Sequence, residues 1–492
     1  MQFNSLIFLF LFLPVFLLIH YILNPKRQNV YLIIAGLFFY SWGQKEAVFI
    51  LFFLIVINYY LSIRISSATK KKNAKMVYIV AILLNLIVLV FYKYLAFFLK
   101  IIGIDFSIEG LPYPTGISFM TFLAISYLTD VYRESEKIKI NFSSYALYIS
   151  FFPKLITGPI AIFNSFEKQL HKRDIKPEDI SIGVKRFIIG LGKKVLIADM
   201  FAKVSDKIFL IPSDRMGTPI SWIGVVAYTF RIYYDFSGYS DMAIGLGRMI
   251  GFKIPENFNY PYAADSIKEF WNRWHITLGH WLKIYLFFPI AYSVMRRTKK
   301  DRIFGMKIEN LAYLTGINVT FAICGLWHGA NLTFVVWGLY YGVLLSLEHM
   351  GIRKMFKKRF PIFVRIAVTQ FLVMIGWVLF RSEDLQYSYH YLRSMFGLGG
   401  VDNIEIGMEN FLNNEFLFVM IIGVIGVFPV IPKLKRISEK ISVDLVKSKN
   451  SLSAFFKYCL LFTDNVFYSV VFVFGIMAMN VENYRPFIYF NF

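Results

Sequence analysis

The sequence is poor in charged residues, and above all in acidic ones, compared with soluble proteins. Charged residues make up 17% of the chain, and only 31 of its 492 residues are acidic. A soluble protein carries about 25% charged residues, whereas here hydrophobic residues reach 57% and the mean hydropathy is +0.55. The two cysteines, Cys324 and Cys459, both lie in apolar runs, which argues against a disulfide framework or a zinc site. This composition predicts an integral membrane protein.

The shortage of acidic residues leaves a net charge of +22, a value that can indicate nucleic-acid binding. The basic residues are nevertheless grouped in short clusters between apolar runs, at 70–75, 296–302, 353–359 and 433–440. Cytoplasmic loops of membrane proteins show this pattern. We therefore expect the lipid bilayer, and no nucleic acid, to be the partner of these charges.

Apolar runs of about 20 residues, the length of a helix that crosses a bilayer, recur along the chain and predict an all-α polytopic membrane protein. The stretches 142–163 and 278–295 are apolar but contain prolines, so we expect them to be broken or re-entrant. About eleven runs qualify as spans and a further one follows; they lie near 6–24, 30–43, 46–63, 77–99, 114–132, 184–201, 218–238, 309–326, 330–347, 361–380, 414–431 and 455–478.

The ends of the chain and its loops predict an orientation. The run 6–23 follows no basic segment and precedes no small-residue cleavage site, so we expect a first span and not a signal peptide. Lys and Arg follow the first, third and fifth runs, which predicts that these loops are cytoplasmic and that the N-terminus and the C-terminal segment 484–492 lie outside. The longest outside segment, 381–412, is shorter than the roughly 50 residues of a domain. A single membrane domain over 1–492 is expected.

His328 lies in the longest charge-free part of the chain. The segment Leu311–Leu347 contains no Asp, Glu, Lys or Arg, and both of its flanks are basic. Two helices that turn near 329–331 would place His328 at membrane depth, where a histidine is a candidate functional residue and can act as a general base. A structural histidine at a helix break is the alternative. A nucleophilic pair with Cys324, four residues earlier, is disfavoured because no third orienting group is visible.

Two further polar patches are candidates. Glu269–Leu278 concentrates Trp271, Arg273 and His275, which is typical of an interfacial helix that lines a cavity; an aromatic belt with a snorkelling arginine is the alternative.

In the other patch, Arg231 and Asp235 are four residues apart and are expected to form an ion pair on one helix, with Ser237 and Asp241 extending the polar face. Gly238, between two serines, is expected to open that helix. This patch predicts either a polar lining for a substrate path or a structural ion pair.

Seven segments occur in an order that resembles the membrane-bound O-acyltransferases, and within them the bacterial alginate O-acetyltransferase branch. The resemblance covers most of the chain, with a motif-rich core at about 112–345 and C-terminal helices at 361–492. The ending Arg485–Phe490 is also typical. The seven segments are Tyr40–Gly43, Pro114–Phe122, Phe151–Pro159, Tyr234–Ala243, Pro255–Pro261, Glu269–Leu278 and Leu326–Asn331.

The resemblance implies a ring of tilted helices around a central tunnel in the bacterial cytoplasmic membrane. It implies catalytic roles for His328 and His275, with Trp327 and Asn331 among the tunnel-lining residues. Asn272 stands where the family commonly has a second arginine, and the segments 282–285 and 288–291 also depart from the family pattern. These departures concern contacts with the donor or a partner.

The implied reaction is acetyl transfer from acetyl-coenzyme A, or another acyl thioester, to an extracellular polysaccharide such as alginate or peptidoglycan. No bound cofactor is expected. Expected partners are an exported SGNH or esterase-like protein and the polysaccharide synthesis machinery. The alternatives are transfer of D-alanine from a carrier protein to teichoic acid, and a transporter or flippase that uses the same polar path.

Overall fold

The computed structural model describes residues 1–104, 113–134, 141–171, 173, 175–212, 215–298, 300–303, 305–399, 407–430, 433, 451–481 and 487. Across these residues the chain is helical almost throughout, and β1 (Arg302–Ile303) and β2 (Met306–Lys307) form one short antiparallel hairpin. The predicted all-α fold is confirmed. Most of the basic cluster 433–440, and the C-terminal segment 484–492 apart from Phe487, lie outside the described residues.

The first half of the chain contains α1 (Leu13–Ile22), α2 (Pro25–Ser41), α3 (Ala47–Ser66), α4 (Lys71–Lys93), α5 (Leu95–Ile101), α6 (Ile117–Arg133), α7 (Phe142–Ser150), α8 (Phe163–Glu167), α9 (Pro177–Gly192), α10 (Asp199–Phe209) and α11 (Thr218–Met249). The second half contains α12 (Ile267–Arg273), α13 (Ile276–Leu282), α14 (Phe288–Arg297), α15 (Ile308–His328), α16 (Leu332–Leu347), α17 (Arg353–Arg359), α18 (Ile362–Arg381), α19 (Leu385–Met395), α20 (Asn414–Gly426) and α22 (Ser451–Val481).

In the described part of the chain, six helices are long and apolar enough to cross a membrane. They cover Ala47–Ser66, Lys71–Lys93, Ile308–His328, Leu332–Arg359, Ile362–Arg381 and Phe462–Asn480. The predicted spans do not all match single helices: the run 77–99 is divided at Tyr94 between α4 and α5, whereas the run 184–201 continues from α9 through a π turn into α10. Large apolar side chains remain exposed on the long helices, with Phe49 at 73% and Phe363 at 70%. Faces of this kind suit contact with lipid.

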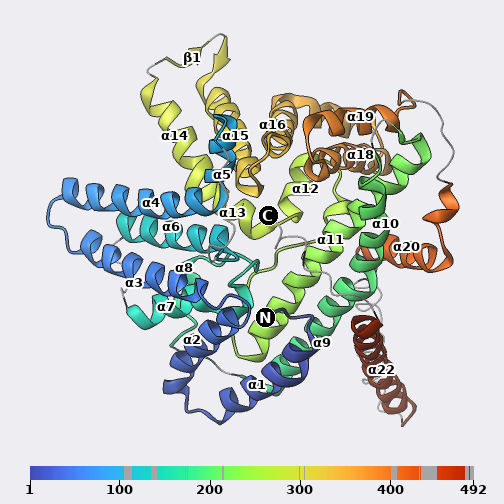
Figure 1. Ribbon diagram of the computed structural model, residues 1–492, viewed down its shortest axis with the longest axis horizontal. Helices are drawn as coiled ribbons and strands as arrows, with labels where there is room; N and C mark the ends of the chain where they lie inside the picture. The colour runs from blue at the N-terminus through green and yellow to red at the C-terminus, as the bar shows by residue number, and fades with distance from the viewer. Residues whose placement is uncertain are drawn as a thin grey trace.

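The helices surround a central group (Figure 1). α11, α12 and α13 lie near the middle of the molecule, with α3, α4 and α6 on one side, α14–α16 on another and α18–α20 on a third. Both ends of the chain reach α11: the rings of Phe3 and Phe487 lie 5.0 Å and 4.9 Å from the ring of Tyr239, between centroids. The core is therefore built around α11.

The two proline-containing stretches behave differently. The stretch 142–163 is broken as predicted, because α7 ends at Ser150 and is followed by a 3-10 turn and a buried non-helical segment. The predicted break in 278–295 was wrong, since the chain stays helical there through a π turn at Lys283–Phe287 and places Pro289 in the first turn of α14. The alternative that this stretch is re-entrant stays a prediction. Local π adjustments can accommodate a proline within a membrane helix.

The predicted opening of the helix at Gly238 was also wrong. α11 runs without interruption from Thr218 to Met249. Gly238 instead allows α9 to approach closely: a Cβ on Gly238 would lie 2.7 Å from the Gly190 carbonyl oxygen, and a Cβ on Gly190 would lie 2.5 Å from the Gly238 oxygen. The small residues therefore serve helix packing, as is common in membranes.

Candidate active site

His328 lies at the turn of a helical hairpin, as the sequence predicts. α15 ends at His328, and α16 begins after Asn331, whose side chain accepts a hydrogen bond from the Thr333 backbone N–H at 3.1 Å. Such an N-cap satisfies one of the donors that a first helical turn leaves open. Asn331 also donates to the Glu383 carbonyl. Asn331 therefore holds the turn in place.

Two consecutive residues next to the end of α4 bind the last carbonyls of α15. The Lys93 Nζ donates to the Trp327 carbonyl, and the Tyr94 hydroxyl donates to the Leu326 carbonyl at 2.8 Å. The final carbonyls of a helix have no partner within the helix, and the negative end of its dipole favours a cation. These two side chains fix the backbone immediately before His328.

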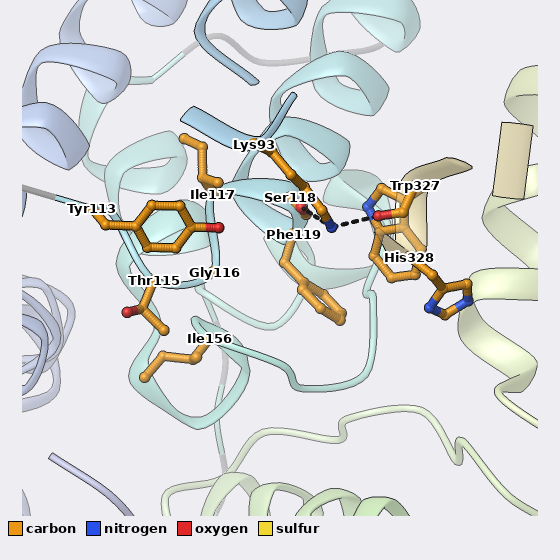
Figure 2. A pocket seen from close by; sticks show the side chains of 10 residues that line it. All are labelled: Lys93, Tyr113, Thr115, Gly116, Ile117, Ser118, Phe119, Ile156, Trp327 and His328. Atoms are coloured by element: carbon orange, nitrogen blue, oxygen red, sulfur yellow. Dashed lines mark hydrogen bonds between the residues drawn. The ribbon is translucent and has the colours of Figure 1, made fainter. Parts of the chain in front are cut away.

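A small pocket lies beside these bonds and reaches His328 (Figure 2). Its free volume is about 20 Å³, which is room for about one water molecule. The start of α6 and the segment after α7 form two of its walls, so the motifs Pro114–Phe122 and Phe151–Pro159 meet Leu326–Asn331 here. The lining residues are Lys93, Tyr113, Thr115, Gly116, Ile117, Ser118, Phe119, Ile156, Trp327 and His328.

Aromatic rings surround the buried His328. The imidazole centroid lies 4.6 Å from the ring of Trp327, 5.0 Å from Phe380 and 5.1 Å from Trp337. Trp327 in turn stacks on Phe122 of α6 at 5.0 Å. These rings shield His328 from bulk water, which strengthens electrostatic interactions at the site.

His275 is also buried, at a break between α12 and α13. It has a left-handed backbone with φ of 45°, a conformation that is uncommon for a residue other than glycine and is often found at functional sites. Its Nδ1 lies 3.1 Å from Asn257 Oδ1, which also accepts from the Thr277 hydroxyl at 2.7 Å. Because an amide oxygen only accepts, Nδ1 carries the proton. The prediction of a helix through His275 was wrong, because α12 ends at Arg273 and α13 begins only at Ile276.

The structure brings the predicted histidines together. His328 is close enough to His275 and to Lys93 for electrostatic interaction with both. Trp271 packs against Trp337 at 5.8 Å between centroids, and Trp337 contacts His328, so Trp271 lies one ring away from it. Arg273 pairs with Glu269 at 2.8 Å in a half-exposed position.

The polar patch of α11 lies elsewhere, at the interface with α9, α10 and the π turn 193–198 between them. The expected pair of Arg231 with Asp235 was wrong: Arg231 binds Asp206, and Asp235 accepts from Lys194 at 2.6 Å. Neighbouring helices offer these charges better-placed partners than the same helix does. Asp241 accepts from Arg186 and Lys193, and Ser237 is buried in the same helix. None of these four α11 residues lines the pocket at His328, and their role in a substrate path stays a prediction.

The sequence reasoning missed Lys93, Ser118 and Asn257. Lys93 carried a usable signal, because it is a charge within the predicted span 77–99, and charges inside membrane spans often mark functional sites. Asn257 stood in a recognised motif, but nothing in the sequence pairs it with His275. In the part of the chain that the structure describes, no group of three or more His, Cys, Asp or Glu side chains is arranged to hold a metal ion.

A second, larger pocket lies at the opposite end of the α15–α16 hairpin. Its volume is about 350 Å³, and its lining includes the cations Lys268, Arg353, Lys354 and Lys357. Glu348 also lines it, but this carboxylate accepts the backbone N–H groups of Ile267 and Lys268 at 2.7 Å and 2.9 Å. None of the four cations is ion-paired within the described residues. The pocket is therefore suited to an anion.

Comparisons with known proteins identify the family. The profile of the membrane-bound O-acyltransferase family matches residues 34–388. The chain is 35% identical to the probable alginate O-acetylase AlgI of Pseudomonas aeruginosa, over 83% of this chain and 78% of that protein. It is 32% identical to the peptidoglycan O-acetyltransferase of Helicobacter pylori, over 84% and 83%. A teichoic acid D-alanyltransferase of Bacillus subtilis is 27% identical over 56% and 70%. The chain thus belongs to the membrane-bound O-acyltransferase family and is a multi-pass membrane acyltransferase.

Proposed function

We propose that this protein transfers an acetyl group from a cytoplasmic thioester, acetyl-coenzyme A, to a hydroxyl group of a polysaccharide outside the cell membrane, with His328 as the general base. The observation that carries the proposal is the position of His328: it is buried at a hairpin turn, within an aromatic enclosure, and it lines a pocket. His275 and Lys93 lie close by. This arrangement suits a reaction that must exclude water, because water would hydrolyse the thioester.

The relatives support the choice of acceptor. Two of them are named for O-acetylation of alginate and of peptidoglycan, at 35% and 32% identity over most of both chains. Both names describe acetyl transfer to a glycan. The D-alanyltransferase match is weaker and covers 56% of this chain. We therefore favour O-acetylation of a polysaccharide over D-alanyl transfer, and either glycan is a suitable first acceptor to test.

The basic pocket supports a phosphate-bearing thioester as the donor. Coenzyme A carries several phosphate charges, and four cations line this pocket. One face of α16 connects the two ends of the hairpin: Leu345 lines the basic pocket, Tyr341 and Trp337 follow at intervals of four residues, and Trp337 contacts His328. Eight residues of helix rise about 12 Å. A thioester anchored by its phosphates could extend along this face toward His328.

The proposed reaction is a single transfer. His328 accepts the proton of the acceptor hydroxyl, and the oxygen attacks the thioester carbonyl carbon. The tetrahedral intermediate collapses, the carbon–sulfur bond breaks, and the thiolate takes the proton from His328. The products are an acetyl ester and free coenzyme A. His275, oriented by Asn257, lies close to His328 and would orient the reacting groups.

The proposed setting is the bacterial cytoplasmic membrane, with the N-terminus and C-terminus outside and the basic pocket on the cytoplasmic side. The segment 381–412 was the longest predicted outside segment, and it is too short to form a domain. We therefore propose that an exported SGNH or esterase-like protein and the polysaccharide synthesis machinery complete the pathway outside.

The test is acetyl transfer by purified protein from labelled acetyl-coenzyme A to alginate or peptidoglycan fragments. His328→Ala should lower the rate by about 10²- to 10⁴-fold, the usual contribution of a general base, while expression and thermal stability stay close to those of the unaltered protein. Undiminished transfer by His328→Ala would overturn the role of His328. Absence of transfer by the unaltered protein, together with the exported partner, would overturn the proposed function.

A further inference from the structure

Lys93 is a charged residue close to His328 that has no role in the proposed reaction. It is the last residue of α4, a position from which a lysine in a membrane helix usually extends its ammonium toward water. Here the side chain turns inward, donates to the Trp327 carbonyl and to the Ser118 hydroxyl at 3.4 Å, and lines the pocket at His328 (Figure 2). Lys93 is partly buried in this position, and the position requires an explanation because even partial removal of a charge from water is unfavourable.

Capping of α15 does not explain the charge. Tyr94 binds the adjacent carbonyl, that of Leu326, with an uncharged hydroxyl at 2.8 Å. Tyr94 does not line the pocket, whereas Lys93 does. An ammonium has three donors, and the two hydrogen bonds of Lys93 use two of them. The third is available to a ligand in the pocket.

The pocket has a second feature that favours negative charge. Ile117, Ser118 and Phe119, which form the first turn of α6, line it together with Lys93. The N-cap residue is Gly116, and no side chain caps this helix end. The positive end of the α6 dipole and the Lys93 ammonium therefore act on the same small volume. Lys93 also interacts electrostatically with His328.

We propose that Lys93 is a further catalytic residue, whose ammonium, with the first turn of α6, stabilises the negative charge that develops on the acyl oxygen during transfer. The inference rests on the proposed acyl transfer. When the acceptor oxygen bonds to the thioester carbon, the carbonyl electrons move to the acyl oxygen, and the third Lys93 donor binds it. When the thiolate leaves, the charge moves to sulfur and the carbonyl forms again. Groups that bind only this transient charge raise kcat and leave substrate binding nearly unchanged.

The decisive variant is Lys93→Gln, which removes the charge but keeps a donor for the Trp327 carbonyl. We expect kcat to fall by about 10²- to 10³-fold, the usual effect of losing one such donor, with the KM values for donor and acceptor changed less than about threefold. Lys93→Arg should recover most of the rate. Tyr94→Phe is the matched control, because it removes a hydrogen bond to the neighbouring carbonyl. Loss of one neutral hydrogen bond of this kind should lower kcat by no more than about fivefold.

Three results would overturn the proposal. One is a Lys93→Gln rate equal to that of Tyr94→Phe, which would leave only a capping role. Another is a raised acceptor KM with unchanged kcat, which would make Lys93 a binding residue. The third is a folded Lys93→Arg protein as inactive as Lys93→Gln. Thermal melting of each variant identifies loss of fold. If the unaltered protein transfers no acetyl group, the proposed function fails and the catalytic role of Lys93 fails with it; transfer by the unaltered protein together with any of the three results above overturns the role of Lys93 alone.

Discussion

The interface of α11 with α9, α10 and the π turn 193–198 between them holds polar side chains inside an apolar protein. The pocket at the end of α15 also does so, but with different partners. In the interface, Lys194 binds Asp199 at 2.9 Å and Asp235 at 2.6 Å, and Asp241 binds two cations. In the pocket, Lys93 and His328 meet carbonyl groups, aromatic rings and open volume. Opposite charges neutralise each other in the first region. The second keeps a charge and an imidazole beside space for a substrate.

This difference separates structural from chemical roles. A buried ion pair is costly to break, because the remaining charge stays buried. Its members are then held by each other and are poorly placed to act on a substrate. A polar group that lines a pocket can instead bind what enters. The comparison therefore predicts that changes in the interface reduce stability, whereas changes at the pocket reduce activity.

The largest expected effect is a loss of stability when a charge in the α11 interface is removed. Lys194→Met leaves Asp199 and Asp235 buried without the ammonium they share, and breaking a buried pair typically costs about 3–5 kcal/mol. We expect a clear fall in the midpoint of thermal unfolding in detergent and a lower yield, while each folded molecule keeps its transfer rate. His328→Ala should show the reverse pattern. A stable but inactive Lys194→Met protein would show that the interface takes part in the chemistry.

A smaller effect is expected where the two regions meet. The Asn257 amide donates to Ser240 of α11 at 3.3 Å and accepts from His275. Asn257→Ala removes the group that orients His275, and misplacement of a catalytic group can cost about 10²-fold in rate. We expect a fall in kcat of up to about this size. Ser240→Ala, which removes only the bond toward α11, is the matched control and should keep most of the rate; equal losses would argue that the link to α11 matters most.

The smallest expected effect concerns the basic pocket. Lys354→Gln with Lys357→Gln removes two pocket cations, and loss of electrostatic attraction should raise the KM for acetyl-coenzyme A by about tenfold at low salt. The difference should shrink as salt screens the charges. Lys358→Gln with Arg359→Gln removes two charges from the same helix outside the pocket lining. Equal KM values for the two double variants would show that the donor does not bind in this pocket.

Much of the fold could be predicted from the pattern of apolar runs. The hairpin turn at His328 followed from a charge-free segment that is too long for one span and has basic flanks. The count of spans was less accessible, because turns of π helix, such as the one at 193–198, depend on how neighbouring helices pack. The wrong predictions at Gly238 and Pro289 have the same origin: both residues disfavour a helix in isolation, and tertiary contacts or a local π turn overcame that preference.

The candidate site was predictable in part. His328, His275 and Trp327 could be named from motifs, and the structure places them near one another. The partner of His275 could not be named, because Asn257 is 18 residues away and no spacing rule joins a loop amide to a left-handed residue. The pairing of Arg231 with Asp235 failed because a sequence shows neighbours along one helix and not the better-placed charges of another.

Composition and motif order alone determined that this chain is a helical membrane protein of an acyltransferase family with a histidine at a hairpin turn. These properties are local, since apolar length and residue order are enough to fix them. Only the tertiary structure decided which charges neutralise each other and which face a pocket. That outcome depends on contacts between distant segments, as when the end of α4 places Lys93 against the carbonyl before His328. Along the chain the same lysine is a charge within the run 77–99, and nothing in the sequence shows which groups it faces.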